Sequence, residues 1–197
     1  MEFDINNIII EKLNSKHSAH VEGFSCLKED DETLNQYKSK KRKKFKKHSE
    51  NIDVFFKKEA LKEQEQSLNT THLFFLGGKL IGFISLCADS IRLDLNEKEE
   101  ENLPFVSVPA LKIARLAIDK NFQFGGLGKL LIQFSVKKAL EVREIIGVRF
   151  LTVDCYEHRL SYYKKFGFIQ NGIQREGRQP DQPLSLRLNI DTYLENM

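Results

Sequence analysis

One stretch of the chain restricts its fold more than any other: an alternating apolar segment, Ser107–Ile118, runs into a cluster of three glycines and then straight into a helix-forming segment. The glycines are Gly125, Gly126 and Gly128. A turn of this kind leaves backbone N–H groups free at the start of a helix, where they and the helix dipole bind phosphate oxygens. The pattern therefore predicts a β-turn-α unit that binds an anionic ligand.

Two common phosphate-binding motifs do not fit this turn. Lys129 follows Gly128 directly and Leu130 takes the position of the hydroxyl residue, so the turn is not a P-loop of ATPases. The glycine spacing is also not that of a dinucleotide-binding loop. The alternative that the glycines serve only a tight turn stays open.

Patterns elsewhere predict a mixed α/β sheet. We expect strands at Asn7–Leu13, Thr71–Leu76, Leu80–Ala88, Phe150–Cys155, Phe168–Ile173 and Leu184–Ile190, and a hairpin turn at Gly77-Gly78. Helices are expected within residues 28–64, at Lys129–Ile146 and at His158–Lys165, and an acidic loop at Asp94–Asn102. The apolar residues in and just before the helix Lys129–Ile146 predict one buried face. They are Leu127, Leu130, Leu131, Phe134, Val142, Ile145 and Ile146. The 197 residues are expected to form one domain.

Composition narrows the class of protein. The three cysteines are distant and odd in number, which argues against disulfides, and no Cys/His cluster suggests a metal. The N-terminus lacks a basic leader segment, and no apolar run approaches the roughly 20 residues of a membrane span. We therefore expect a cytoplasmic protein with no metal and no membrane association.

The segment Gln123–Gly128 resembles the pyrophosphate loop of the GNAT N-acetyltransferase superfamily, Q/R-x-x-G-x-G. Ser161–Phe168 is similar to the F-Y-x-x-x-G-F segment of that family. The resemblance implies a mixed, mostly antiparallel sheet of six or seven strands, flanked by helices, with one splayed parallel pair. It also implies an acetyl-CoA-dependent N-acetyltransferase, in which an amine of a small molecule or protein attacks the thioester directly.

The resemblance also implies binding and catalytic roles for individual residues. The backbone of Leu116, Ala117 and Ile118 would bind the pantetheine arm, and Tyr156 stands where the family often has a pantetheine-contacting asparagine. The pyrophosphate would lie on Gln123, Phe124, Gly125, Gly126, Leu127, Gly128 and Lys129. Tyr163 matches the tyrosine that protonates the CoA thiolate, or it is only a packed aromatic. Glu157 and His158 follow the expected strand Phe150–Cys155 and are candidates for the general base. Asp154, on that strand, is another candidate, and the choice stays open.

A basic block offers a further alternative. Eight of the ten residues from Lys38 to Lys47 are basic, which leaves 23 basic against 28 acidic residues in the rest of the chain. Such a block is a solvated helix face or a binding surface for an anion. Phe24, Cys26, Leu34, Asn35 and Tyr37 resemble the F-x-C…L-N-x-[YF] opening of a GNAT subgroup that includes toxins acetylating aminoacyl-tRNA.

Three functions follow as hypotheses: the small-molecule or protein acetyltransferase, the tRNA-directed toxin, and a catalytically degenerate CoA-binding sensor. Nucleic acid is a partner only if residues 38–47 bind tRNA. A homodimer is a further hypothesis, in which the strands Leu184–Ile190 of two copies pair with each other.

Overall fold

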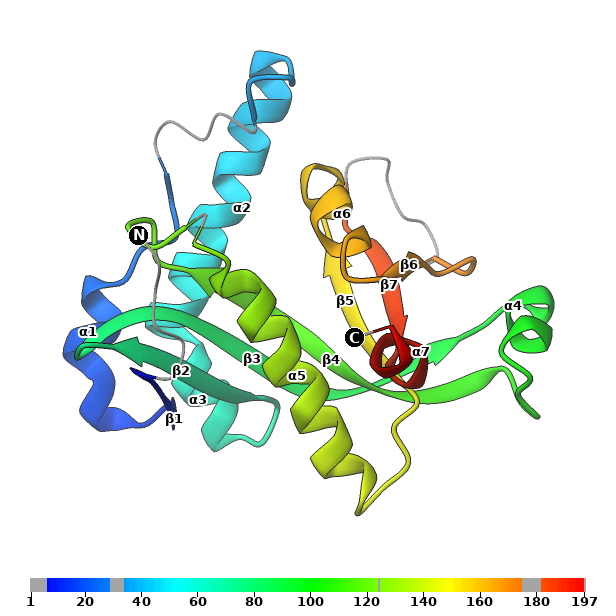
Figure 1. Cartoon of the computed structure of the whole chain (residues 1–197). Helices are drawn as coiled ribbons and strands as arrows, with labels where there is room; N and C mark the ends of the chain where they lie inside the picture. Colours follow the sequence, from blue (N-terminus) through cyan, green and yellow to red (C-terminus); the bar gives the residue numbers. More distant parts are fainter. Residues whose placement is uncertain (1–6, 29–33, 124, 175–181, 197) are drawn as a thin grey trace. The chain divides into compact units, whose positions relative to one another are not determined.

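The computed structural model describes residues 7–28, 34–123, 125–174 and 182–196 (Figure 1). The described residues within 1–86 and 114–132 form one compact unit, and those within 87–113 and 133–197 form the other. Strands β3 (Lys79–Arg92) and β4 (Ser107–Ile118) and helix α5 (Leu127–Arg143) contribute residues to both units. The expectation of a single domain over the whole chain stays a prediction.

The first unit combines helices with antiparallel strands. Strand β1 (Ile8–Lys12) pairs with β2 (Thr70–Leu76), which pairs with β3 through the turn at Gly77 and Gly78. Both glycines have positive φ, which suits this turn. The short helix η2 (Ser15–His17) leads into α1 (Ser18–Gly23), and the long α2 (Ser39–Lys58) continues into α3 (Ala60–Glu65).

Aromatic side chains make the core of this unit. Phe56 stacks on Phe83 with ring centroids 4.0 Å apart, and Phe24 meets both rings edge-on. Aromatic pairs in these arrangements stabilise beyond the area they bury. The core therefore ties α2 and the segment after α1 to the middle of β3.

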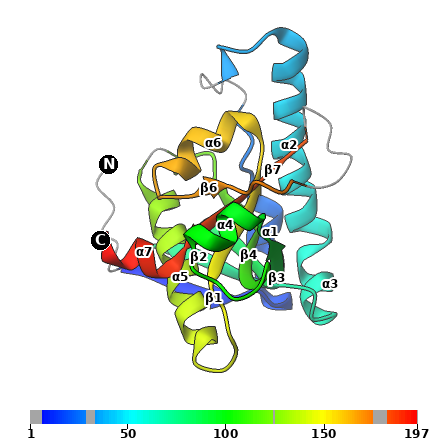
Figure 2. The same cartoon turned by 90° about the vertical axis from the view of Figure 1, so that its right-hand side faces the viewer.

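The second unit carries the other strands. Strand β5 (Phe150–Cys155) runs parallel to β4, and β7 (Leu184–Asn189) pairs antiparallel with β5 and with β6 (Ile169–Gln170). Figure 2 shows α4 (Leu95–Glu100), α6 (Glu157–Lys164) and α7 (Ile190–Glu195) around these strands. Strand β7 lies between β5 and β6, so where β6 pairs with it no edge is left for a second copy of the chain. The homodimer stays a prediction.

The seven strands of the described residues follow the order β1-β2-β3-β4-β5-β7-β6, with β4 and β5 as the parallel pair. The predicted mixed, mostly antiparallel sheet flanked by helices is confirmed. Among the described residues, none of the helices has the length and apolar character that crossing a membrane requires.

Two expectations about local structure were wrong. The segment Asp94–Asn102 contains α4, because the Asp94 and Glu97 side chains form a reciprocal capping box that starts a helix. Helix α5 ends at Arg143, and Ile145 and Ile146 are 84% and 58% exposed rather than buried.

A buried ion network joins α4 to β7 in the second unit. Arg187, 2% exposed, pairs with Glu97 through Nη1 and donates a second hydrogen bond to Asn171 (3.1 Å). The Gly172 N–H donates to the same Glu97 carboxylate at 2.7 Å. Burial alone would raise the pKa of Glu97, but these hydrogen bonds and the Arg187 charge outweigh it and lower the pKa.

We expect Arg187→Met to lower the free energy of unfolding by about 3–5 kcal/mol, because it leaves the Glu97 carboxylate buried without its cation. Urea unfolding at neutral pH measures the loss. The control, Lys138→Met, breaks the more exposed pair with Glu141 and should cost less than about 1 kcal/mol. Since the folded-state pKa of Glu97 is lowered, its contribution is present at neutral pH and disappears as pH falls through that pKa. Equal losses in the two variants would contradict the prediction.

Candidate active site

The glycine turn lies in the first unit between the end of β4 and the start of α5. Gly126 has φ of +77°, a conformation that suits glycine, and its carbonyl accepts from the Lys129 N–H at 2.9 Å. Gly125, Gly126 and Lys129 are exposed, whereas Leu127 is buried and anchors the helix start. A Cβ on Gly126 would meet no atom within 4 Å, so the outer side of the turn is open. Phe124 lies outside the described residues.

Asp119 shapes the turn from the strand end. Its buried carboxylate accepts from the N–H and the side-chain amide of Asn121, at 3.0 and 2.9 Å, and from the Ser25 N–H at 3.2 Å. Its own N–H donates to the Ile81 carbonyl on β3. The chain direction after Leu116, Ala117 and Ile118 is thereby fixed, with Ala117 buried and the other two half-buried.

Gln123 braces the turn from within. Its Nε2 donates to the Cys26 carbonyl at 2.9 Å and to the Ile118 carbonyl at 3.1 Å. The resemblance placed Gln123 among the pyrophosphate residues. The geometry gives its amide a structural task, holding the loop against β4 and against the segment after α1.

That segment is in turn held by Asp53 of α2. The Ser25 hydroxyl donates to Asp53 Oδ2 at 2.7 Å, and the Cys26 N–H donates to Oδ1 at 2.9 Å. The Lys120 N–H donates to the Ser25 carbonyl at 2.8 Å. Sequence reasoning missed Asp53 and Ser25. An acidic residue just before the buried pair Phe55 and Phe56 was the available signal, because a half-buried carboxylate needs donors.

Tyr163 lies in the second unit, on α6. It is buried, and its ring meets Tyr162 and Phe168 edge-on at 5.2 and 5.5 Å. Burial, and then the neighbouring Tyr162 and Cys155, raise the pKa of Tyr163 well above its ordinary value. Burial also raises the pKa of Tyr162 to about 12. Tyr163 therefore keeps its proton at neutral pH, as a general acid must.

The other predicted residues of this unit gather at the start of α6. Tyr156 is the N-cap residue, and its ring lies 6.4 Å from the half-buried His158 ring. Glu157, in the first turn, is exposed. A carboxylate at this position also favours the helix dipole, so its position alone does not select it as the base.

Asp154 occupies a different face of β5. Alternation along the strand places it opposite Cys155, and it pairs with Lys112 at 3.0 Å. Lys112 also lies 3.8 Å from Asp89, which accepts from the Thr152 hydroxyl at 2.7 Å. This polar cluster of Asp89, Lys112, Thr152 and Asp154 was not found from the sequence, because its members come from three strands. Its ion pair with Lys112 makes Asp154 a weaker candidate for the base than Glu157 or His158.

Within the described ranges, no group of three or more His, Cys, Asp or Glu side chains could hold a metal ion. The three cysteines have free thiols, and burial raises the pKa of the Cys155 thiol to about 12. Cys155 therefore stays a thiol, which does not suit a nucleophile.

Comparison with known families identifies an acetyltransferase domain in the chain. The model of the acetyltransferase (GNAT) domain matches residues 33–179, well over half of the chain. The matched range includes the glycine turn, the candidate residues of α6 and the basic block.

One curated protein and two solved structures are similar to this chain, at sequence identities between 15% and 26%. A tRNA-acetylating toxin of Mycobacterium tuberculosis (strain ATCC 25618 / H37Rv) is 26% identical over 119 residues, which are 59% of this chain and 71% of the toxin. The structure of AtaT complexed with acetyl-methionyl-tRNAfMet has a TM-score of 0.73 at 16% identity, covering 96% of this chain and 99% of AtaT. A mutant AtaT toxin bound to the C-terminus of the antitoxin AtaR and acetyl-CoA has a TM-score of 0.68 at 15% identity, covering 96% and 98%.

We expect Gly126→Glu to weaken acetyl-CoA binding at least 10-fold, because the new carboxylate would lie where the turn should hold phosphates. Isothermal titration calorimetry measures the affinity. Gly78→Glu is a matched control: Gly78 has φ of +74°, close to the +77° of Gly126, and equally open space around it. Both variants carry similar backbone strain, and only the first should lose affinity. Unchanged binding by Gly126→Glu would remove the turn from the cofactor site.

Proposed function

The chain belongs to the GNAT acetyltransferase family, and we propose that within this family it acetylates the α-amino group of an aminoacyl-tRNA. The predicted acetyl-CoA-dependent N-acetyltransferase is confirmed at the level of the family. The acceptor is the proposed part. The observation that carries it is the similarity to a curated tRNA-acetylating toxin.

The basic block supports a nucleic-acid acceptor. An amine that is to be acetylated is itself a cation in water, and eight basic residues within Lys38–Lys47 would repel it. When the same amine is carried by a tRNA, the block faces a polyanion instead. Charge therefore favours the tRNA-bound amine over the free amine of a small molecule.

The chemistry needs two proton transfers. The neutral α-amine attacks the thioester carbonyl, the C–N bond forms, the C–S bond breaks, and CoA leaves as a thiolate. A base takes a proton from the amine nitrogen, and we assign the proton donated to the thiolate to the Tyr163 hydroxyl. Its buried, protonated state supports this assignment. Glu157 and His158 are the candidates for the base.

The pantetheine and pyrophosphate contacts are part of the proposal. The backbone of Leu116–Ile118 and the turn from Gly125 to Lys129 would hold the cofactor, with Tyr156 at the pantetheine. We also propose that the enzyme works in the cytoplasm, where tRNA is charged, and that a neutralising protein binds it. The AtaT–AtaR complex motivates the last point.

Tyr163→Phe tests the acid. We expect kcat to fall about 100-fold or more, because the thiolate loses its proton donor, while the acetyl-CoA dissociation constant stays within about 2-fold. Tyr162→Phe is the matched control: it deletes the same atom from the neighbouring ring and should leave kcat nearly unchanged. Because the pKa of Tyr163 is raised, the single-turnover rate should show no loss from this group up to pH 10. A Tyr163→Phe enzyme with wild-type kcat would exclude the role.

Radiolabelled acetyl-CoA tests the acceptor. We expect label on aminoacylated tRNA, and none on the same tRNA after its ester is hydrolysed, because only the former presents the amine. Mild alkali should then release the label as an N-acetyl amino acid. A free amino acid, a polyamine and a lysine peptide serve as parallel acceptors. Label on one of these, with none on any aminoacyl-tRNA, would contradict the proposal.

A further inference from the structure

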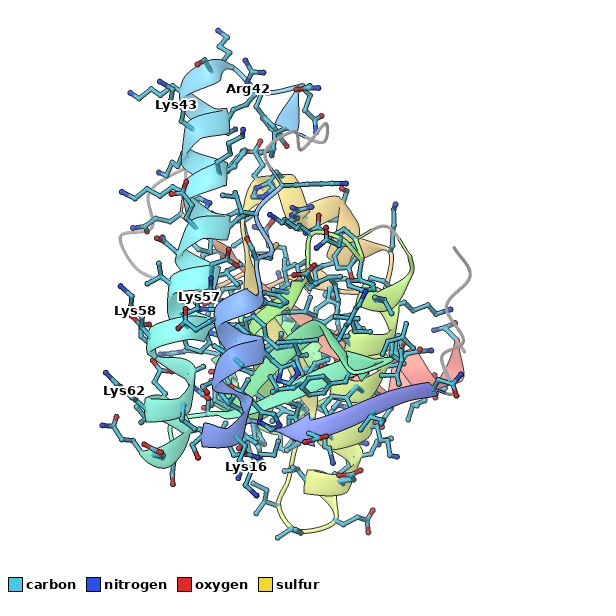
Figure 3. All side chains as sticks on the ribbon, turned by 90° about the vertical axis from the view of Figure 1, so that its left-hand side faces the viewer. Lys16, Arg42, Lys43, Lys57, Lys58 and Lys62 are labelled. Carbon is cyan, nitrogen blue, oxygen red and sulfur yellow. The ribbon has the colours of Figure 1, made fainter. Side chains whose placement is uncertain are left out.

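Five exposed lysines form one line along α2 and α3. At 100° per residue, Lys40, Lys43, Lys47, Lys58 and Lys62 fall within a sector of about 100°. Only Glu59 separates α2 from α3, and helical hydrogen bonds cross this junction: its N–H donates to the Phe55 carbonyl and its carbonyl accepts from the Glu63 N–H. In Figure 3, Lys43, Lys58 and Lys62 project on the same side of the two helices, away from the strands.

The opposite side of α2 faces the core. Phe45 and Phe56 are each 2% exposed, and their angular positions lie about 150° and 170° from the centre of the lysine line. Between the two ends of the line, the same face carries Asn51 and the half-exposed Val54. Two carboxylates are near: Glu50 beside the middle, and Glu65 at the end of α3. The line is therefore cationic at both ends, with a neutral middle.

The energetics of the helix oppose this arrangement. Lysines three and four residues apart repel one another, and cations in the first turn oppose the positive end of the helix dipole. The first turn of α2 contains no acidic residue that would offset them, and the N-cap residue Lys38 makes no side-chain cap. A helix face that only needed solubility would mix both signs of charge. The charges are better explained by an anion outside the chain.

The dimensions favour an extended polyanion. With a rise of 1.5 Å per residue, Lys40 and Lys47 are about 10 Å apart along the axis, and Lys47 and Lys58 about 16 Å. One small anion cannot span these gaps, whereas a nucleic-acid backbone presents regularly spaced phosphates over this length. The line carries no aromatic side chain for stacking on bases, which is typical of backbone contact without sequence reading.

We propose that this lysine line is a docking surface for the phosphate backbone of the acceptor RNA, contacted at both ends of the α2–α3 face. The identity of the RNA as a tRNA rests on the proposed function, but binding to the line does not require acetyl transfer. The surface lies entirely within the first unit, so the contact is independent of the residues of α6.

Two groups of variants test the two ends: Lys40→Gln with Lys43→Gln and Lys47→Gln, and Lys58→Gln with Lys62→Gln. The control, Lys79→Gln with Lys137→Gln, removes two exposed charges elsewhere. Glutamine keeps helix propensity and removes repulsion, so α2 should remain folded, as circular dichroism can check. The probe is fluorescent, uncharged tRNA, and its anisotropy is measured between 50 and 300 mM salt, roughly the range over which phosphate contacts weaken.

Each lost phosphate contact should reduce the slope of log affinity against log salt by about 0.7–0.9. Relative to 1 M salt, where these contacts contribute little, the two-lysine variant should therefore bind roughly 25- to 60-fold more weakly at 0.1 M salt, and the three-lysine variant more weakly still. The control should match the wild type. In turnover assays of both variants, the KM for aminoacyl-tRNA should rise and kcat should stay unchanged.

Three results would overturn the proposal. The first is a wild-type salt slope in both variants, the second is no tRNA binding by the wild-type protein, and the third is a loss of binding confined to the Lys40–Lys47 variant. Weakened tRNA binding in both variants supports the docking surface even if no aminoacyl-tRNA is acetylated. That result would separate the failure of the proposed function from the failure of this inference.

Discussion

The two-residue segment Ser25-Cys26 is the joint on which the glycine turn depends. Asp53 of α2 holds it from one side, through the Ser25 hydroxyl and the Cys26 N–H. Gln123 and Asp119 hold it from the other, through the Cys26 carbonyl and the Ser25 N–H. Hydrogen bonds to a carboxylate are each worth about 1.5–3 kcal/mol, so this joint is stiff. A phosphate-binding turn gains from such stiffness, because its N–H groups then need no reordering when the ligand binds.

Helix α2 consequently meets two different demands. Its inner side supplies Phe45, Phe55 and Phe56 to apolar packing and Asp53 to the joint. Its outer side carries the lysines, at some cost to the helix itself. Packing of the inner side offsets that cost, since tertiary contacts rather than intrinsic propensity supply most helix stability in proteins. Phe55 and Phe56 anchor the C-terminal half of α2 in the core of the first unit, and the N-terminal half, which carries the basic block, extends beyond β1, β2 and β3 in Figure 1.

The sequence revealed the parts of the site that depend on local geometry. Glycines between a strand and a helix, and an F-Y-x-x-x-G-F-like segment, are readable because each needs neighbouring residues only. The polar cluster around Lys112 and the brace through Asp53 were missed, since the residues that contact one another lie 23 to 63 positions apart and no periodicity links them. The error over Asp94–Asn102 has another cause. Its acidity suggested a loop, but two of the acids cap a helix and one of them, Glu97, pairs with the buried Arg187.

Tyr162 and Tyr163 show what a motif can and cannot decide. The spacing to Gly167 selects Tyr163, and the structure adds that its ring is buried beside Cys155 and Phe168. Burial raises the pKa of both phenols, so protonation alone does not distinguish them. A phenol with a raised pKa is a weaker acid, so it needs a developed negative charge on the acceptor atom before it gives up its proton. A thiolate leaving from a thioester gains basicity as the C–S bond breaks. In the proposed reaction, Tyr163 would therefore transfer its proton late, when the negative charge on sulfur is already developed.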